Sequence, residues 1–375
     1  MKILYITTVG VTMGFFRSFI ANLLEAGHTV DIACNETESP VHACYREWGC
    51  RVFPLSCTRS PLSGGNLTAV SEIRELVRRE RYDIVHCHSP IAAACTRIAC
   101  RGLRRQGVRV IYTAHGFHFY QGAPLKNWLV FYPVEKLCAR WTDALITINH
   151  EDYTLAQRKM HAKRVEYVPG VGLDVEKFAH VTFDRAAKRR ELGVPEDAFL
   201  LLSVGELNEN KNHETVIRAL AQLPNTIHYV IAGEGPLRSR LLSTAKEAGA
   251  ETRVHLLGYR TDVAELDHAA DAYVLPSFRK GLNVSLMEAM AAGLPCIASD
   301  IRGNRELVRD GETGFLCPPG DAAHFAAGLR RLVEDASLRS RFGACGMEHI
   351  KQFSKERVEA QLLEIYKECL EGSDV

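Results

Sequence analysis

At 375 residues, the chain is long enough for two domains that each bury a core of their own. The formal net charge is +1, but it is unevenly spread: Lys and Arg outnumber Asp and Glu by 21 to 14 in residues 1–170, and the remainder has 25 against 31. The composition is that of an ordinary globular protein without repeats or low-complexity tracts, which excludes a disordered chain.

Cysteine and apolar patterning argue against export and membrane spanning. Twelve cysteines are scattered without a Cys-x-x-Cys pair, which favours reduced thiols. No run of 18 apolar residues occurs, and Arg17 interrupts the apolar N-terminal stretch without a small-residue cleavage site. We therefore expect a cytoplasmic protein.

The first half alternates short β-branched strands with helical stretches. Residues 2–8 predict a strand that passes through a loop with Gly10 and Gly14 into a helix ending near Gly27. Further strands are expected at 29–34, 51–55, 83–87, 109–113, 144–147 and 165–168. This alternation predicts a parallel, doubly wound sheet of about seven strands. Gly14 would face a ligand at a strand's carboxyl end, although the loop lacks the dinucleotide-binding glycine spacing.

Arginines cluster after the strand expected at 83–87. Arg97, Arg101, Arg104 and Arg105 fall at i, i+4, i+7 and i+8, and so would share one helix face. Such a face suits an anionic lipid or a lipid diphosphate, and a solvated basic helix is the plain alternative. Nucleic acid is a third possibility, which no recognition motif supports.

Histidines stand at the ends of two strands. His115 and His118 lie among aromatic residues in the segment 112–120, which leaves a strand and contains Gly116. They are either packed loop residues or ligand contacts, and a strand-end loop favours contact with a ligand. His86 and His88 alternate on one strand, but no third ligand accompanies them, so packed or cleft-lining histidines are favoured over zinc.

The run 168–174 contains one proline and two glycines and marks a domain boundary. We assign 1–172 to a first domain, 173–354 to a second, and 355–375 to a C-terminal helix that could cross back to the first. Strands at 199–204, 228–231, 253–257, 272–275 and 296–298, with helices near 212–222, 235–248 and 283–292, repeat the doubly wound pattern. Two such Rossmann-like α/β domains would face a cleft at their strand carboxyl ends.

Two segments of the second domain suit a nucleotide. Lys211 lies at a helix start after the strand at 199–204, where a diphosphate would explain a lysine that otherwise opposes the helix dipole; a solvated lysine is the alternative. The stretch 275–304 passes through Gly281 into a buried helix whose positive end suits a phosphate. Glu288 in that helix is either a solvated charge or an acceptor for vicinal sugar hydroxyls.

The stretch 275–304 also resembles a known signature. The matching residues are Pro276, Ser277, Gly281, Glu288, Ala289, Met290, Gly293, Leu294, Pro295, Arg302, Gly303 and Asn304. They resemble the nucleotide-sugar site of family 4 of the retaining GT-B glycosyltransferases, and the segments 115–124 and 205–213 look like its capsule and exopolysaccharide branch. The resemblance implies a GT-B fold and a UDP-sugar donor. It further implies retaining, metal-independent transfer to a polyprenyl-diphosphate-linked saccharide at the inner membrane face.

On this resemblance, His115, Lys211 and Glu288 are the catalytic candidates, with Lys211 on the diphosphate and Glu288 on the ribose. The expected donor contacts are Gly14, Glu206, Lys280, Gly281, Leu282, Asn283 and Glu288, and the acceptor or lipid contacts are His118, Arg97, Arg101, Arg104 and Arg105. The chain departs from the family pattern at Lys280, where a glutamate is expected, and at Glu206, where an arginine is expected.

We therefore predict a peripheral membrane glycosyltransferase of polysaccharide synthesis, without a cofactor or a metal. No Asp-x-Asp pair is available to hold a metal-bound diphosphate. Three alternatives stay open: a sugar-nucleotide 2-epimerase on a similar architecture, a binding-only relative weakened by Lys280 and Glu206, and a nucleic-acid-binding protein.

Overall fold

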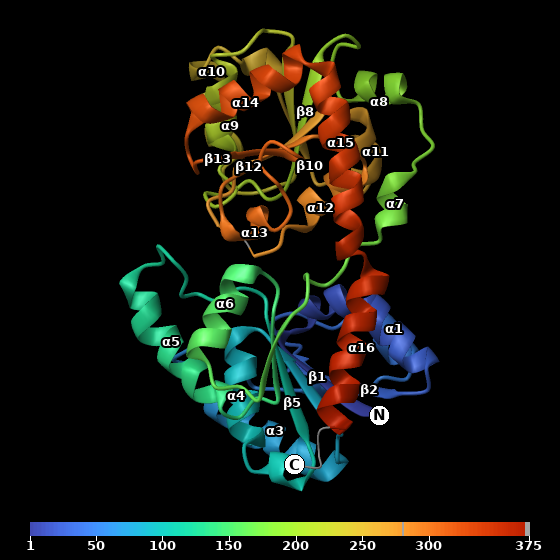
Figure 1. The fold of residues 1–375 in the computed structure, drawn as a ribbon, viewed down its shortest axis with the longest axis vertical. Coiled ribbons are helices and arrows are strands. Elements are labelled where there is room, and N and C mark those ends of the chain that lie inside the picture. Colours follow the sequence, from blue (N-terminus) through green and yellow to red (C-terminus); the bar gives the residue numbers. More distant parts are fainter. Residues whose placement is uncertain (280, 372–375) are drawn as a thin grey trace. The chain divides into compact units, whose positions relative to one another are not determined.

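A computed structural model describes residues 1–279 and 281–371 and divides the chain into two compact units. The first unit joins Met1–Gly172 to the C-terminal segment that begins at Lys355, and the second comprises Leu173–Ser354. In Figure 1 each unit is a sheet covered by helices. The chain therefore leaves the first unit once and returns to it as its last helix.

The first unit contains a seven-stranded parallel sheet. In spatial order its strands are β3 (Val52–Pro54), β2 (Thr29–Asn35), β1 (Lys2–Val9), β4 (Ile84–His88), β5 (Arg109–Ala114), β6 (Ala144–Thr147) and β7 (Arg164–Tyr167). Its helices include η1 (Gly10–Phe16), α1 (Arg17–Glu25), α2 (Cys44–Glu47), α3 (Gly65–Glu80), α4 (Pro90–Cys100), η2 (Leu103–Gln106), α5 (Leu125–Ala139), α6 (His150–Lys159) and α16 (Lys355–Glu371).

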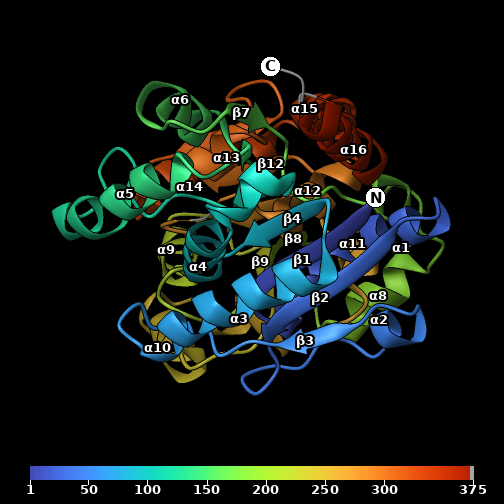
Figure 2. The same cartoon turned by 90° about the horizontal axis from the view of Figure 1, so that it is seen from below.

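Alternate residues of β1 point into two different cores, because side chains alternate between the faces of a strand. Leu4 and Ile6 pack with α3, α4 and α5, whereas Ile3 and Tyr5 pack with α1, α2 and α16. Figure 2 shows α5 and α16 toward opposite sides of this sheet. Apolar burial on both faces explains why these strands are nearly continuous runs of aliphatic residues.

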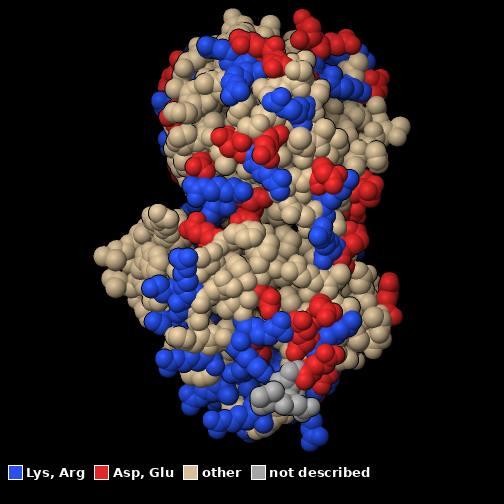
Figure 3. Space-filling view, in the orientation of Figure 1, with Lys and Arg blue, Asp and Glu red and all other residues tan. Residues whose placement is uncertain are grey.

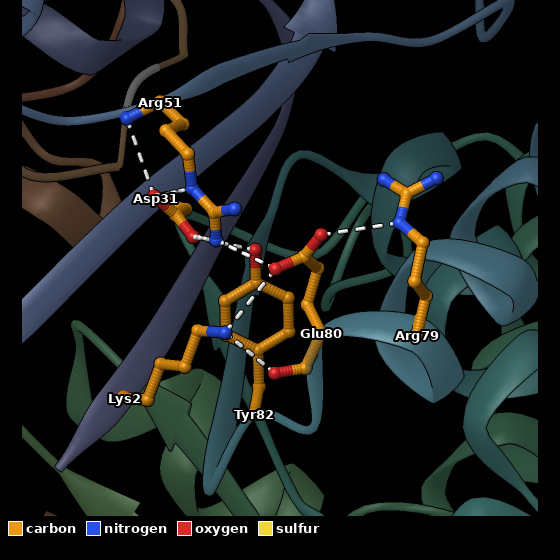
Figure 4. Close-up of polar contacts among 6 residues, drawn as sticks. All are labelled: Lys2, Asp31, Arg51, Arg79, Glu80 and Tyr82. Carbon is orange, nitrogen blue, oxygen red and sulfur yellow. Dashed lines mark hydrogen bonds and ion pairs between the residues drawn. The ribbon is translucent and has the colours of Figure 1, made fainter.

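Ion pairs cover the amino ends of the first three strands of this sheet, opposite the edge where parallel sheets bind ligands (Figure 4). Arg51 bridges Asp31 and Glu80, and Glu80 also meets Lys2 at 3.3 Å and Arg79 at 3.1 Å. These cations, Arg51 first, lower the pKa of Glu80 to about 2. This edge is therefore occupied by the protein's own charges.

The second unit contains a six-stranded parallel sheet. In spatial order its strands are β10 (Val254–Gly258), β9 (Ile227–Ala232), β8 (Phe199–Val204), β11 (Ala272–Leu275), β12 (Cys296–Ser299) and β13 (Gly314–Cys317). Its helices include α7 (Val175–Ala179), α8 (Arg185–Glu191), α9 (His213–Leu220), α10 (Arg238–Glu247), α11 (Val263–Ala269), α12 (Val284–Ala291), α13 (Arg302–Arg305), α14 (Ala322–Glu334) and α15 (Ala336–Ile350); short η3 (Glu251–Arg253) and η4 (Lys351–Phe353) complete the assignment.

The prediction of two doubly wound α/β domains is confirmed, since both sheets are wholly parallel and carry helices between successive strands. The edge strand β13 was not predicted. Its first residue is a glycine because a Cβ atom at Gly314 would lie 2.1 Å from the carbonyl oxygen of Cys296. Among the described residues, none of the helices combines the length and apolar character needed to cross a membrane.

Candidate functional site

Buried polar atoms without a hydrogen-bond partner gather at the carboxyl ends of β8, β11 and β12. Among the described residues, they belong to the side chains of Asn210, Ser277, Asn283, Ser299 and Asn304. An unsatisfied buried polar group costs roughly 1–3 kcal/mol, so native proteins hold few of them. Because ligands bind at this edge of parallel sheets, the cluster indicates a site for a polar ligand.

Lys211 lies against the backbone where β8 ends. A Cβ atom at Gly205 would come within 2.8 Å of the Lys211 Cε and Nζ atoms, so the glycine leaves room for the lysine side chain. Asn208 shapes the loop: its Oδ1 accepts from the Lys211 N–H at 3.0 Å, and its Nδ2 donates to Glu206 Oε2 at 2.9 Å. The exposed Glu206 and the Lys211 ammonium thus share the sheet edge with the unsatisfied polar groups.

The loop after β9 supports the loop that carries Lys211. A Cβ atom at Gly233 would lie 2.0 Å from the carbonyl oxygen of Gly205, and one at Gly235 would lie 2.5 Å from that of Leu207. Only glycines permit this approach of two backbones. The sequence analysis did not single out these residues, although Gly-x-Gly-Pro directly after a strand is a usable turn signal.

Glu288 is the fifth of the eight residues of α12 and is half-buried. Burial raises the pKa of its carboxyl group to about 7, and the charge of Lys177 opposes the shift. On the neighbouring α11, Asp267 is fully buried, and neither of its carboxylate oxygens has a hydrogen-bond partner among the described residues. Burial first, and Glu288 second, hold the pKa of Asp267 well above its usual range. Glu288 therefore titrates near neutral pH, beside a buried carboxyl group whose pKa is also raised.

The other donor contacts predicted on this segment lie at the start of α12. Gly281 is half-buried, and Leu282 and Asn283 are buried. Asn283 Oδ1 accepts from the Ser285 hydroxyl at 3.0 Å, whereas its Nδ2 belongs to the unsatisfied cluster. Lys280 lies outside the described residues. The structure thus brings Asn283 and Lys211 to one sheet edge, with Glu288 about a turn into the helix that follows it.

Histidines line the carboxyl end of β4 and β5 in the first unit. His88 Nδ1 lies 3.2 Å from His115 Nε2, and the His88 ring stacks on Phe16 with centroids 4.1 Å apart. His88 is buried, which keeps its pKa well below the usual value, and its Nε2 has no partner among the described residues. The ring nitrogen of His115 is thus within hydrogen-bond distance of the neutral imidazole of His88.

His86 is not a metal ligand in this arrangement, because hydrogen bonds occupy both ring nitrogens. Nδ1 meets the Tyr366 hydroxyl of α16 at 2.5 Å, and Nε2 meets the Thr113 hydroxyl at 2.8 Å. Burial lowers the pKa of His86 to about 3. His86 is therefore a packed core residue, as the sequence favoured over a zinc ligand.

His118 lines a pocket of the first unit, which we call the β1–β4 pocket. Its volume is about 280 Å³, and it is lined by Thr8, Val9, Thr12, Arg59, Pro61, Ser89, Pro90, Ile91, His118 and Phe131. The exposed His118 ring stacks on Phe131 of α5 at 4.5 Å. Ser89 has φ 66° and ψ 134°, a rare conformation for a residue other than glycine. Such backbone strain clusters at functional sites.

The glycine prediction in the first unit concerned Gly14. This residue is exposed in η1, and a Cβ atom there would meet nothing within 4 Å. The steric requirement lies instead at Gly10, where a Cβ atom would be 2.4 Å from the carbonyl carbon of Pro40. Gly14 therefore remains a proposed donor contact only through its backbone.

The predicted arginine face is wrong. The helix α4 ends at Cys100, so Arg104 and Arg105 belong to η2 and do not continue the face that begins at Arg97. Arg97 is fully buried, donates to Glu135 Oε2 at 2.8 Å and lies over the Tyr112 ring, so it cannot face a lipid.

The three remaining arginines lie away from the β1–β4 pocket. Arg104 grips Asp143 with two hydrogen bonds of 2.8 and 2.7 Å, and Asp143 directly precedes β6. Because a helix after a parallel strand returns to the sheet's amino edge, this end of α4 is opposite the pocket. Arg101 and Arg105 are exposed there, Arg101 lying over Trp141 at 5.7 Å.

Comparison with known proteins decides the family. Residues 15–170 match the family described as Glycosyl transferase 4-like domain, and residues 184–349 match Glycosyl transferases group 1. The chain is 38% identical over 372 residues to the protein named glycosyltransferase EpsD of Bacillus subtilis, which covers 97% of this chain and 96% of that relative. The chain belongs to this glycosyltransferase family.

Two further similarities support the glycosyltransferase assignment and its fold. The chain is 30% identical over 299 residues to the UDP-Gal:alpha-D-GlcNAc-diphosphoundecaprenol alpha-1,3-galactosyltransferase of Escherichia coli, covering 77% of this chain and 76% of that one. The crystal structure of Anabaena HepE with UDP and glucose superimposes with a TM-score of 0.80 at 22% identity, over 98% of this chain and 99% of that one. This glycosyltransferase accordingly has the GT-B fold, as the resemblance implied.

Proposed function

We propose that this glycosyltransferase transfers a sugar from a UDP-sugar to a polyprenyl-diphosphate-linked saccharide, retaining the anomeric configuration, in cell-surface polysaccharide synthesis. The observation that carries the proposal is the edge of β8, β11 and β12, where Lys211, the start of the α12 helix and the unsatisfied polar groups meet. An ammonium suits a diphosphate, and the carboxylate of Glu288 suits vicinal ribose hydroxyls.

The named relatives support both substrates. The name of the E. coli relative specifies a UDP-galactose donor and an acceptor on diphosphoundecaprenol. The HepE structure contains UDP and glucose in the same fold. The similarity to EpsD, which is named a glycosyltransferase, extends along nearly the whole chain and supports sugar transfer. The role in exopolysaccharide assembly rests on the resemblance of the segments 115–124 and 205–213 to that branch of the family.

In this proposal the second unit binds the donor. Glu288 holds the ribose, Lys211 and the backbone amides of Gly281, Leu282 and Asn283 bind the diphosphate, and His115 contacts the donor sugar, with Gly14, Glu206 and Lys280 as further contacts. As the bond between the anomeric carbon and the phosphate oxygen breaks, negative charge grows on the diphosphate. Preorganised cations and N–H groups lower the barrier most at that stage. The departing phosphate oxygen takes the proton of the acceptor hydroxyl, which attacks from the same face.

The β1–β4 pocket is the proposed acceptor site. It combines apolar walls with the Arg59 guanidinium, the Ser89 hydroxyl and the His118 imidazole, groups that suit a sugar or a phosphate. A polyprenyl carrier keeps such an acceptor in a lipid bilayer, so we place the enzyme's action at the inner face of the cell membrane.

Calorimetry with a panel of nucleotide sugars, followed by transfer to a short-chain prenyl-diphosphate saccharide, tests the proposal. We expect a UDP-sugar to bind and its sugar to appear on the acceptor without added metal. Isomerisation of the donor without transfer would support the 2-epimerase alternative. Binding without either reaction would support a binding-only relative.

Lys211→Ala refines the assay. We expect this variant to lose affinity for the UDP-sugar while its affinity for uridine stays unchanged, because uridine lacks the diphosphate. Equal losses for both ligands would contradict the role of Lys211.

A further inference from the structure

One side of α5 exposes an unusual amount of apolar surface. Leu125, Leu129, Val130, Val134 and Leu137 are 72%, 69%, 54%, 46% and 49% exposed, and together they form what we call the outer face of α5. At 3.6 residues per turn their positions span one half of the helix circumference, and the buried Cys138 and Ala139 fall on the other half. Large contiguous apolar patches on soluble proteins mark surfaces that contact another apolar medium.

The opposite side of the same helix is also apolar and is already packed. Trp128, Phe131 and Tyr132 lie against the core formed with α3 and α4, and Cys138 and Ala139 are buried. The residues of the outer face are therefore not needed for packing against the core, because the inward side of α5 already provides it. A helix that is apolar all round belongs in an apolar environment on both sides.

The charges on α5 identify that environment. Its single carboxylate, Glu135, is buried against Arg97, so it contributes no exposed negative charge. Lys126 is exposed and Lys136 is half-buried on the helix, and the exposed Arg140 follows its last residue. In Figure 3 the outward bulge at the level of α5 is largely uncharged, with Lys and Arg side chains beside it. An apolar helix face whose own exposed charges are all cations is typical of helices that lie on anionic membranes.

We propose that the outer face of α5 docks onto an anionic lipid bilayer, with the helix axis along the membrane surface. The inference rests on the proposed function in one respect. Phe131 on the inward side of α5 lines the β1–β4 pocket and stacks on His118. The helix that meets the bilayer is therefore also a wall of the pocket that receives the head group of the lipid-linked acceptor.

Co-sedimentation of the full chain with vesicles tests the docking directly. The test variant is Leu129→Ser with Val130→Ser, and the matched control is Leu67→Ser, because Leu67 is 78% exposed on α3 in the same unit. On vesicles of phosphatidylglycerol and phosphatidylcholine, we expect the test variant to bind at least tenfold more weakly than wild type and the control to bind as wild type does. Thermal melting of each variant verifies folding.

A charge variant separates the two contributions to binding. Lys126→Gln with Arg140→Gln should weaken binding to the anionic vesicles most at low salt, and leave the weak binding to pure phosphatidylcholine unchanged. Vesicle binding unaffected by the serine and glutamine variants alike would overturn the proposal. So would a dimer, detected by light scattering, that the serine variant dissolves, because the outer face would then belong to a second copy.

Transfer assays distinguish failure of the docking inference from failure of the proposed function. The serine variant should transfer normally to a soluble short-chain acceptor and at least tenfold more slowly to an acceptor embedded in vesicles. Equal rates on embedded acceptors would overturn the docking role even if the enzyme is active. If wild type transfers to neither acceptor but the serine variant still loses vesicle binding, the docking inference stands and the proposed acceptor is wrong.

Discussion

Glu288 is the residue proposed to hold the ribose and has a pKa near 7, so its charge should control nucleotide affinity across physiological pH. Its pKa is raised to about 7 by burial, with Lys177 opposing. Above that pKa both oxygens of the ionised carboxylate are charged acceptors, so we expect UDP to bind more tightly as pH rises from 6 to 8 and to reach a plateau above it. Calorimetry at several pH values measures this.

Two variants test the assignment of that titration. Glu288→Gln should weaken UDP binding at pH 8 by roughly 1.5–3 kcal/mol, the value of a hydrogen bond to a charged group, and remove the pH dependence. Asp267→Asn should leave the pH dependence in place, because the proposed nucleotide contact is made by Glu288, whereas Asp267 is fully buried on α11. If the pH dependence of UDP binding instead disappears in the Asp267 variant, the titrating group is Asp267 and our assignment to Glu288 is wrong.

His88 should set which nitrogen of His115 carries the proton. Neutral His88 has one N–H, and a buried N–H without an acceptor is more costly than a bare lone pair. Because His88 Nε2 is the atom without a partner, we expect the proton on Nδ1, donated to His115 Nε2 3.2 Å away. Neutral His115 would then carry its own proton on Nδ1.

Nitrogen-15 NMR of the labelled imidazoles reads this tautomer without any assay of activity. His88→Leu should release His115 to the other tautomer and lower kcat roughly tenfold, about 1.4 kcal/mol, whereas His88→Asn keeps a donor near the Nδ1 position and should restore most of it. The same His115 tautomer in the leucine variant would show that His88 only packs.

A buried ion pair between Arg97 and Glu135 joins the helices α4 and α5. Mutation of this pair should change the stability of the contact between the two helices. Arg97 and Glu135 are 0% and 8% exposed in their side chains and lie 2.8 Å apart. Removing one partner strands a buried charge, so we expect Glu135→Leu to lower the free energy of unfolding by about 3–5 kcal/mol. The exposed pair Lys351–Glu348, with side chains 64% and 75% exposed, is the control, where Glu348→Ala should cost less than about 1 kcal/mol.

Urea unfolding monitored by circular dichroism measures both changes. The double variant Arg97→Met with Glu135→Leu should recover most of the loss, because apolar side chains of similar size can replace a buried pair. A double variant as unstable as the single one would mean that the pair itself, and not the stranded charge, stabilises this contact.

Strands that are buried on both faces could be predicted from the sequence, because their aliphatic runs leave little ambiguity. Predicted and observed bounds coincide for β6, β8 and β11. The strand β13 was not predicted because its first residue is a glycine. Contact with a neighbouring strand requires that glycine, and no local sequence pattern indicates such a contact. The arginine face failed for a related reason: periodicity cannot tell that α4 ends at Cys100 or that Arg97 finds a buried partner.

The candidate site was predictable where it depends on local signals, such as the loop and helix that carry Asn283 and Glu288. The residues that were missed depend on tertiary contacts. Asp267 matters because α11 packs on α12, and Ser89 matters because its backbone is strained beside a pocket. The outer face of α5 was likewise hidden, since its apolar residues look like core until their exposure is known.

At the scale of the whole molecule, the last helix ties the end of the chain to its beginning. Val358, Leu362, Ile365 and Tyr366 of α16 pack in the core that also contains Ile3 and Tyr5 of β1. The Tyr366 hydroxyl lies 2.7 Å from that of Tyr5 and 2.5 Å from His86 Nδ1. A change in α16 should therefore loosen the first unit although the second unit lies between them in sequence.

Ile365→Ala tests this coupling by hydrogen exchange. The side chain is 3% exposed, and truncating a buried isoleucine costs about 2–5 kcal/mol through lost burial and the cavity left behind. We expect faster amide exchange in β1 and in β4, which carries His86 and His88, and unchanged exchange in β8, β11 and β12. Ala→Gly at the exposed Ala360 of the same helix controls for helix propensity alone, which accounts for about 1 kcal/mol. If exchange rises equally in both units, they unfold as one, and α16 stabilises the whole enzyme instead of the unit to which it returns.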